Sequence, residues 1–266
     1  MAFALTWMPA VLEAAGLKVA EVEGWANGGR AEMGAVQGVM VHHTVGPKLG
    51  NMPSLNTLIN GRSDLPGPLC NIGLGRDGTW YVVAAGRANH AGVGSWKGVR
   101  TGNSSFIGIE CENTGRADDL PWPAVQMDAL RRGCAELLRH SARDVSWCIG
   151  HKEFALPAGR KPDPLFDMVG FRREVSDILV GIAPLPQLIP AVEIVSPADG
   201  VPPRPTVRRG SAGPSVERLQ RALGLLPTDG IFGPFTEAAV RQWQRTKGLV
   251  PDGIVGPKSW TTVDTQ

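Results

Sequence analysis

The sequence contains few cysteines and carries little net charge. Four cysteines occur among 266 residues, none of them in a CxxC pair: Cys70, Cys111, Cys134 and Cys148. This pattern argues against a disulfide framework, so we expect buried free thiols. The net charge of +2 is too small to indicate a nucleic-acid partner by itself.

The N-terminus lacks the features of a targeting or membrane segment. Its first 18 residues contain no basic run ahead of the apolar residues and no clear small-residue cleavage site, and they are too short and interrupted to span a bilayer. We therefore expect no signal peptide and no membrane insertion. If the substrate lies outside the cytoplasm, another component must release the protein to it.

Charge and proline content divide the chain near residue 205. From Arg204 onward nine Lys and Arg stand against five Asp and Glu, a net charge of +4, whereas the preceding residues sum to −2. Seven prolines between residues 183 and 205 are typical of an extended, semi-rigid linker. We predict four segments: an N-terminal helix and loop that pack on the main domain (1–35), the main domain (36–182), the linker (183–205) and a small C-terminal module (206–266).

The C-terminal module contains an internal repeat. DGIFGPFT (229–236) returns as DGIVGPKS (252–259), with a period of 23 residues. Each copy reads as a turn that leads into a helix, with Thr236 or Ser259 as the predicted N-cap. Apolar residues at helical spacing on either side predict an all-α, three-helix module that binds rather than catalyses. Its positive charge suits an anionic polymer as its partner.

Apolar periodicity in the main domain alternates between helix and strand spacing. We predict helices at 5–17, 54–60, 123–140 and 166–180, strands at 36–41, 106–111 and 145–149, and a hairpin around the Asp77-Gly78 turn. Strands flanked by helices predict an α/β fold with a mixed central sheet.

Polar residues with ligand or acid–base chemistry follow the predicted strands. His151 and Asp163 are a nitrogen and an oxygen donor of the kind that a catalytic zinc uses, and His42 offers a third donor. Lys161 would place a cation beside the metal, and Glu110 lies on the polar side of its strand. Each has a structural alternative: a hydrogen-bonded histidine pair, a salt-bridged glutamate and a simple turn at KPD. Together these residues are better evidence for a metal site than any one of them alone, because they could converge at one edge of one sheet.

Four short motifs follow one another along the chain: VHHT (41–44), NHAG (89–92), IGIECEN (107–113) and GHKEFALPAGRKPDP (150–164). Together they resemble the zinc-dependent N-acetylmuramoyl-L-alanine amidases, which share their fold with peptidoglycan recognition proteins and small phage amidases. Residues 206–263 resemble the peptidoglycan-binding module that is often appended to cell-wall hydrolases. The two resemblances independently indicate the same polymer, peptidoglycan.

The resemblance implies roles for five residues. Zn²⁺ would be held by His42, His151 and Asp163, with water in the fourth position. Glu110 matches the general base of the family, and Lys161 matches the cation that stabilises the developing oxyanion. The bond cut would be the amide that joins the lactyl group of N-acetylmuramic acid to L-alanine.

The resemblance also suggests residues for substrate contact. The candidates are His43, Asn89, His90 and Trp96, with a structural role as the alternative for both histidines. Asn89 replaces the tryptophan that usually precedes this histidine in the family. A tyrosine–histidine pair is replaced by Cys70-Asn71, which leaves Glu110 as the expected base. Cys148 is close enough to His151 to be considered as a ligand, but its strand position favours burial.

The order of amidase, linker and binding module suggests a phage endolysin. We expect a monomer that accumulates in the host cytoplasm and reaches the wall when the membrane is permeabilised. A bacterial autolysin of the same activity is the alternative within this class. A non-catalytic peptidoglycan-recognition protein is the alternative from another class, and the retained set of ligands, base and cation argues against it.

Overall fold

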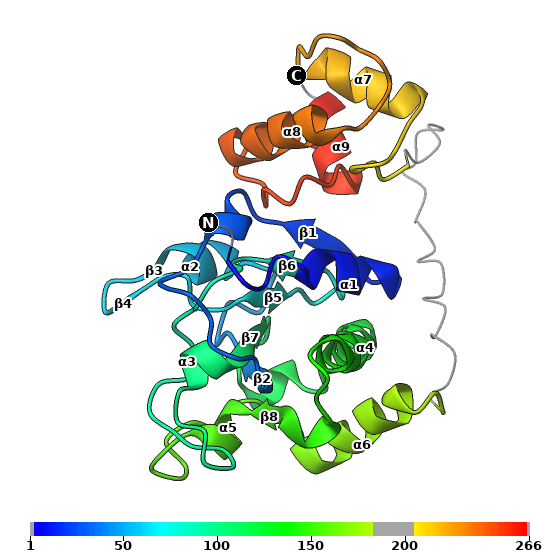
Figure 1. Ribbon diagram of the computed structural model, residues 1–266. Coiled ribbons are helices and arrows are strands. Elements are labelled where there is room, and N and C mark those ends of the chain that lie inside the picture. Colours follow the sequence, from blue (N-terminus) through cyan, green and yellow to red (C-terminus); the bar gives the residue numbers. More distant parts are fainter. Residues whose placement is uncertain (1–2, 183–204, 265–266) are drawn as a thin grey trace. The chain divides into compact units, whose positions relative to one another are not determined.

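The computed structural model describes residues 3–182 and 205–264. The chain forms two compact units, one within Met1–Gln187 and one within Leu188–Gln266 (Figure 1). The predicted linker, apart from its last residue, lies outside the described residues. Within the described ranges, no helix combines the length and the apolar character needed to cross a bilayer.

The first unit is built on a six-stranded mixed sheet. Its strand order is β1-β6-β5-β7-β2-β8. The strands are β1 (Val19–Glu21), β2 (Gly38–His43), β5 (Ile72–Leu74), β6 (Trp80–Val82), β7 (Phe106–Cys111) and β8 (Cys148–Gly150). β5 and β6 form the predicted antiparallel hairpin, and every other neighbouring pair is parallel. The predicted α/β class with a mixed central sheet is confirmed.

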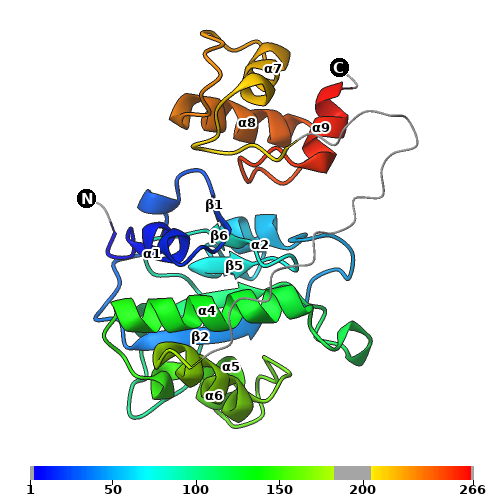
Figure 2. The ribbon, with the colours of Figure 1, turned by 90° about the vertical axis from the view of Figure 1, so that its right-hand side faces the viewer.

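Three helices cover one face of this sheet: α1 (Met8–Ala14), α4 (Ala124–His140) and α6 (Met168–Leu179). Figure 2 shows α4 lying along the sheet. Val41 and Ile109 from the strands share one buried cluster with Leu130 from α4 and Phe171 from α6. Full burial of side chains of this size stabilises the fold by about 1.5–3 kcal/mol each. This face is the main hydrophobic core.

The N-terminal segment belongs to the same core. Leu5, Met8 and Leu12 are fully buried in it, and β1 adds an edge strand parallel to β6. The ring of Trp7 stacks on the ring of His140 at the end of α4, with centroids 3.9 Å apart. Residues before the first predicted strand therefore complete the sheet as well as covering it.

The opposite face of the sheet is covered by shorter elements. Phe154 of α5 (His151–Phe154) and Ala91 pack with Met40, Phe106 and Ile149 in a second, smaller cluster. The described part of this unit also contains α2 (Leu55–Asn60), α3 (Gly102–Ser105), β3 (Gly61–Arg62), β4 (Leu65–Pro66) and 3-10 turns at Trp25–Asn27 and Ala117–Asp119. Among residues 3–182, the long helices α4 and α6 contribute to the main core and not to this smaller cluster.

The observed elements differ from the predicted ones mainly at their ends. The helix predicted at 5–17 is confined to α1, and the strand predicted at 145–149 begins as a 3-10 turn over Val145–Trp147 before β8. The turn forms because the Asp144 carboxylate accepts a hydrogen bond from the amide of Ser146, which competes with extended backbone. The strand predicted at 36–41 runs instead to His43, so that His42 lies within β2.

Over residues 205–264 the second unit contains three helices, as predicted: α7 (Pro214–Ala222), α8 (Pro234–Thr246) and α9 (Pro257–Asp264). A buried glutamine braces the turn of each repeat. The Gln220 side chain donates to Asp229 Oδ1 over 2.8 Å and accepts from the amide of Gly230 over 2.9 Å, and Gln244 makes the same two contacts with Asp252 and Gly253. The repeat in the sequence is therefore a repeat of structure.

The predicted N-caps of this unit are wrong. α8 begins at Pro234 after Gly233, and α9 begins at Pro257, so Thr236 and Ser259 lie inside the first turns. The Thr236 hydroxyl donates to the carbonyl of Ile231 instead of accepting from the helix. Proline sets these starts because its fixed φ suits the first helical position, where its missing N–H is not needed.

Candidate metal centre

The parallel register of three strands brings the predicted ligands to one edge. His42 of β2 lies opposite Glu110 of β7, and Val41 lies opposite Gly150, the last residue of β8. His151 is therefore level with His42 on the neighbouring strand. Asp163 returns to the same place because its carbonyl accepts a hydrogen bond from the amide of Lys152 over 2.7 Å.

Three donor atoms of these residues face one another. His42 Nδ1 lies 3.0 Å from His151 Nδ1 and 3.2 Å from Asp163 Oδ2, and His151 Nδ1 lies 3.0 Å from the same oxygen. All three residues are buried. Zinc bonds of about 2.0–2.1 Å at tetrahedral angles would put ligand atoms about 3.3 Å apart, close to these separations. The donor set, two imidazole nitrogens and one carboxylate, fits a divalent metal such as zinc.

The outer nitrogens of both histidines are occupied by the protein. His151 Nε2 lies 2.8 Å from the carbonyl oxygen of Ala91, and His42 Nε2 lies 3.0 Å from His90 Nδ1. Both rings therefore turn Nδ1 toward Asp163. Histidine ligands of metals are commonly held in this way through the ring nitrogen that does not bind the ion.

Burial and hydrogen bonding set the charge of two of the ligands, His42 and Asp163. Burial lowers the pKa of His42 to about 4, against the hydrogen bond with Asp163, so this ring is neutral at neutral pH. Burial also opposes ionisation of Asp163, but the hydrogen bonds with His151 and His42 outweigh it and hold the pKa of Asp163 below its ordinary value. Neutral imidazole and ionised carboxylate are the forms that bind metals.

Glu110 and Lys161 lie beside this set. Burial, reinforced by the charge of Asp163, raises the pKa of Glu110 well above its ordinary value, while Lys161 and Arg62 oppose that rise. Glu110 Oε2 is buried and has no hydrogen-bond partner among the described residues. A carboxylate with a raised pKa and a free oxygen is suited to accept a proton from a reacting group.

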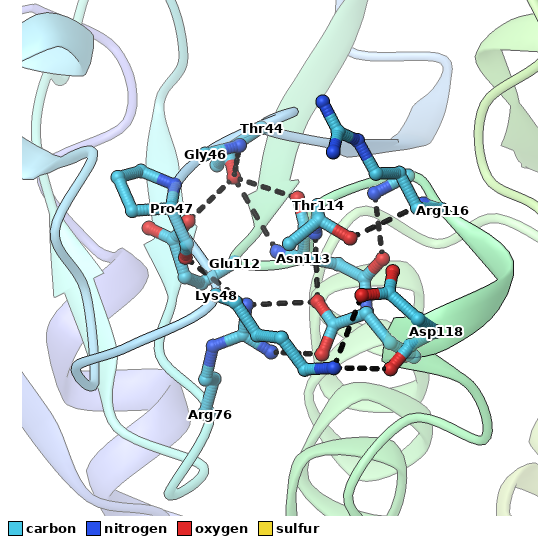
Figure 3. A network of polar contacts seen from close by, with 12 residues as sticks. Thr44, Gly46, Pro47, Lys48, Arg76, Glu112, Asn113, Thr114, Arg116 and Asp118 are labelled. Carbon is cyan, nitrogen blue, oxygen red and sulfur yellow. Dashed lines mark hydrogen bonds and ion pairs between the residues drawn. The ribbon is translucent and has the colours of Figure 1, made fainter.

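A network of polar contacts holds the loops that follow β2 and β7 (Figure 3). The fully buried Glu112 accepts hydrogen bonds from the hydroxyls of Thr44 and Ser54 over 2.8 and 3.0 Å, and from the amide of Ser54 over 3.0 Å. Asp119 forms a two-pronged ion pair with Arg76, at 3.0 and 2.9 Å. The backbone on either side of the site is therefore fixed by buried or half-buried charges.

Two predicted substrate contacts are not brought to the metal centre. Trp96 lies at the other end of β8, where its indole N–H donates to the carbonyl of Ser146 over 3.1 Å. His43 is buried on the face of the sheet opposite the ligands, 6.5 Å from the ring of Trp122 between centroids. The alternation of side chains along a strand separates His43 from its neighbour His42.

The remaining candidates have contacts within the protein. Asn89 donates from its side chain to the carbonyl of Pro66 over 2.9 Å and remains half-buried. His90 is buried and both its ring nitrogens have partners, which favours its structural alternative. Cys148 is fully buried in the main core, away from the ligands, as its strand position indicated.

Sequence reasoning missed two residues that support the site. Glu112 lies within the quoted IGIECEN stretch, but an acidic residue just past the end of a strand carries no signal of burial. Asn103 of α3 accepts hydrogen bonds from the backbone amides of His90 and Ala91, at 2.9 and 2.8 Å. No pattern around Asn103 marks it, because its partners lie more than ten residues away.

A buried set of two histidines and an aspartate beside a carboxylate, at the edge of an α/β sheet, is the kind of site that metal-dependent hydrolases use. The family profile of N-acetylmuramoyl-L-alanine amidase matches residues 32–165, half of the chain. The chain belongs to this family. The profile of a peptidoglycan binding domain matches residues 212–262.

Several known proteins are similar to parts of the chain. A zinc D-Ala-D-Ala carboxypeptidase from Streptomyces albus G is 42% identical over 65 residues, which are 22% of this chain and 26% of that protein. An uncharacterized protein in the bpoA1 3′ region of Kitasatospora aureofaciens is 41% identical over 68 residues, which are 23% of this chain and 58% of that protein. The chain thus spans less than two thirds of the length of either relative.

Among solved structures, a selenomethionine derivative of AmpD is 26% identical with a TM-score of 0.40, covering 52% of this chain and 84% of that one. The Clostridium intestinale endolysin LysCS, an N-acetylmuramoyl-L-alanine amidase, is 18% identical with a TM-score of 0.44, covering 59% and 95%.

Proposed function

We propose that this protein hydrolyses peptidoglycan at the amide between the lactyl group of N-acetylmuramic acid and L-alanine, with zinc bound by His42, His151 and Asp163. The observation that carries the proposal is the convergence of these three donors beside Glu110, within a domain of the amidase family. Zinc bound there would supply a Lewis acid that lowers the pKa of water to about 7.

The other groups of the site have complementary roles in this proposal. Glu110 takes a proton from the attacking water through its free Oε2 and passes it to the leaving amine of L-alanine. Lys161, half-buried and close enough to influence the pKa of Glu110, stabilises the negative charge that develops on the carbonyl oxygen. Glu110 lies on the same face of the sheet as His42, because the two residues are opposite each other in the parallel register.

The C-terminal module would hold the enzyme on its polymeric substrate. Its match to a peptidoglycan binding domain supports this role, and tethering raises the local concentration of the catalytic unit at the wall. We propose that the protein acts as a monomeric phage endolysin, which waits in the host cytoplasm until the membrane is permeabilised. The combination of an amidase unit with a wall-binding unit supports that proposal.

The test is the release of new L-alanine amino termini from purified peptidoglycan. Wild-type protein should release them, a zinc chelator should abolish the release, and added zinc should restore it. Glu110→Gln should lower the rate by about 10²–10⁴-fold, the usual contribution of a general base. Glu174→Gln, on α6 at the opposite face, is the matched control and should keep the wild-type rate.

The same assay separates the competing functions. If the wild-type protein sediments with the wall but releases no amino termini, it is a recognition protein and the amidase proposal fails. If the termini released belong to another residue, the proposed bond is wrong although the hydrolase class stands.

A further inference from the structure

The segment His90–Ala91 lies directly behind the candidate metal centre and touches both histidine ligands. His90 Nδ1 lies 3.0 Å from His42 Nε2, and the Ala91 carbonyl oxygen lies 2.8 Å from His151 Nε2. On its far side, His90 Nε2 lies 3.2 Å from the carbonyl oxygen of Phe106. One dipeptide thus contacts the outer nitrogen of each ligand.

These contacts fix where the ring protons are. A carbonyl oxygen can only accept, so His90 Nε2 donates to Phe106 and His151 Nε2 donates to Ala91. A metal held by His42 Nδ1 requires the proton of this ring to lie on Nε2, which then donates a hydrogen bond to His90 Nδ1. When a metal is bound, both ligands therefore face it with an unprotonated Nδ1, and the metal replaces the hydrogen bonds that these nitrogens otherwise make with Asp163.

Two features hold the dipeptide in this position. Asn103 Oδ1 accepts hydrogen bonds from the backbone amides of both His90 and Ala91, at 2.9 and 2.8 Å. Gly108 in the middle of β7 makes room for the His90 ring, since a Cβ there would lie 2.6 Å from His90 Cγ. A glycine in the interior of a strand otherwise weakens it, so its presence here is explained by the close approach of the ring.

We propose that the His90–Ala91 dipeptide, clamped by Asn103, is a positioning element that sets the tautomer and orientation of both histidine ligands. The inference rests on the metal site of the proposed function. It assigns to the NHAG segment the role of orienting the ligands and gives Asn103 and Gly108 roles in the same unit.

The test is zinc affinity, measured on the full chain by competition with a chromogenic chelator. His90→Leu removes both ring nitrogens and should weaken zinc binding by about 10–100-fold, the usual cost of losing a group that supports a ligand. His90→Asn keeps an acceptor at the place of Nδ1 and should recover most of that loss. Asn103→Ala should weaken binding although it touches neither ligand.

Asn51→Ala is the matched control. Asn51 also joins a loop through two hydrogen bonds, accepting from the amide of Asp77 and donating to Tyr81, each at 2.9 Å, but it touches neither ligand. Its zinc affinity should equal that of the wild type. Circular dichroism of the zinc-free variants checks that each is folded, and a His90→Leu variant that does not fold leaves the decision to Asn103→Ala and His90→Asn.

The outcomes separate this inference from the proposed function. If wild-type protein binds no zinc, the metal site itself is wrong and the inference falls with it. If the wild type binds zinc and Asn103→Ala and the folded His90 variants bind it equally well, only the inference is overturned. Equal losses in His90→Asn and His90→Leu would also overturn it, because the acceptor at Nδ1 would then be irrelevant.

Discussion

Replacing Glu112 should destabilise the first unit and slow hydrolysis, although Glu112 is not one of the proposed metal ligands. Its carboxylate is fully buried and accepts three hydrogen bonds, from the hydroxyls of Thr44 and Ser54 and from the amide of Ser54. In Glu112→Leu the hydroxyls can turn to other partners, but the buried amide cannot. An orphaned amide costs about 1–3 kcal/mol and each lost hydroxyl bond about 1 kcal/mol.

The expected loss of unfolding free energy for Glu112→Leu is therefore about 3–5 kcal/mol, a large share of the roughly 5–15 kcal/mol that stabilises a domain. Glu112→Gln should lose only about 1 kcal/mol. Its amide oxygen can face the amide of Ser54, while its NH₂ group donates to hydroxyl oxygens that rotate to accept. Hydrolysis should slow in the leucine variant because the loop from Thr44 follows directly on the strand that carries His42.

The difference in unfolding free energy between the wild type and Glu112→Gln should depend on pH in a defined direction. Burial raises the pKa of Glu112 above its ordinary value, against the hydrogen bonds from Ser54 and Thr44. A carboxyl group whose pKa is raised by folding contributes to the unfolding free energy most fully below its unfolded-state pKa. That contribution is lost as the pH rises through its folded-state pKa. The stability of wild type relative to Glu112→Gln should therefore be greatest at acid pH and decline as the pH rises through that window.

Urea unfolding of the full chain, followed by near-ultraviolet circular dichroism, measures these differences. Glu136→Gln, which removes one partner of an ion pair with Arg139 on the surface of α4, is the control and should change the unfolding free energy by less than about 0.5 kcal/mol. The reasoning about Glu112 is refuted if Glu112→Leu unfolds within that same margin of the wild type and hydrolyses the wall at the wild-type rate.

Three further predictions concern packing, the metal and the C-terminal module. Gly133→Ala should lower the unfolding free energy by about 1–2 kcal/mol. A Cβ at this position would lie 2.0 Å from the buried ring of Trp80, and this clash costs about 1–3 kcal/mol, more than the gain in helix propensity of up to about 1 kcal/mol. A raised melting temperature would contradict this prediction. Zinc at 100 times its Kd should stabilise the first unit by about 2.7 kcal/mol in calorimetry, and His42→Ala should abolish that gain. Gln220→Leu should destabilise the second unit by about 1–3 kcal/mol, because it leaves the amide of Gly230 unpaired. Sedimentation with walls should weaken while hydrolysis of soluble fragments continues, and unchanged sedimentation would show that this brace is dispensable.

Apolar periodicity in the sequence predicted the main helices and strands of the fold but not the residues at which they begin and end. The apolar stripe of residues 123–140 is α4, and the alternation at 106–111 is β7 to the residue. The helix starts in the second unit were missed because Pro234 and Pro257 set them, and the 3-10 turn before β8 was missed because the capping side chain of Asp144 competed with the strand. β1 has only three residues, too few for a periodic signal.

The sequence by itself determined the types of chemical group available and the strands that carry them. Residue types, turn signals and hydrophobic periods are properties of short stretches, so His42, Glu110, His151 and Asp163 could be marked as candidates, and their roles remain predictions. Tertiary structure alone decided which groups meet. His42 and His151 are separated by 109 positions in the chain, and only the register of β2 with β8 brings their Nδ1 atoms to 3.0 Å.

Tertiary structure also separates some candidates from the metal ligands and brings an unpredicted residue close to them. His43 and Trp96 were candidates for substrate contact together with Asn89, but strand alternation places His43 on the face opposite the ligands, and Trp96 lies at the far end of β8. Asn103 had no signal at all, because a buried hydrogen bond to a distant backbone amide leaves no local pattern. Pairings over long separations are fixed by the packing of the whole domain, and no window of sequence contains them.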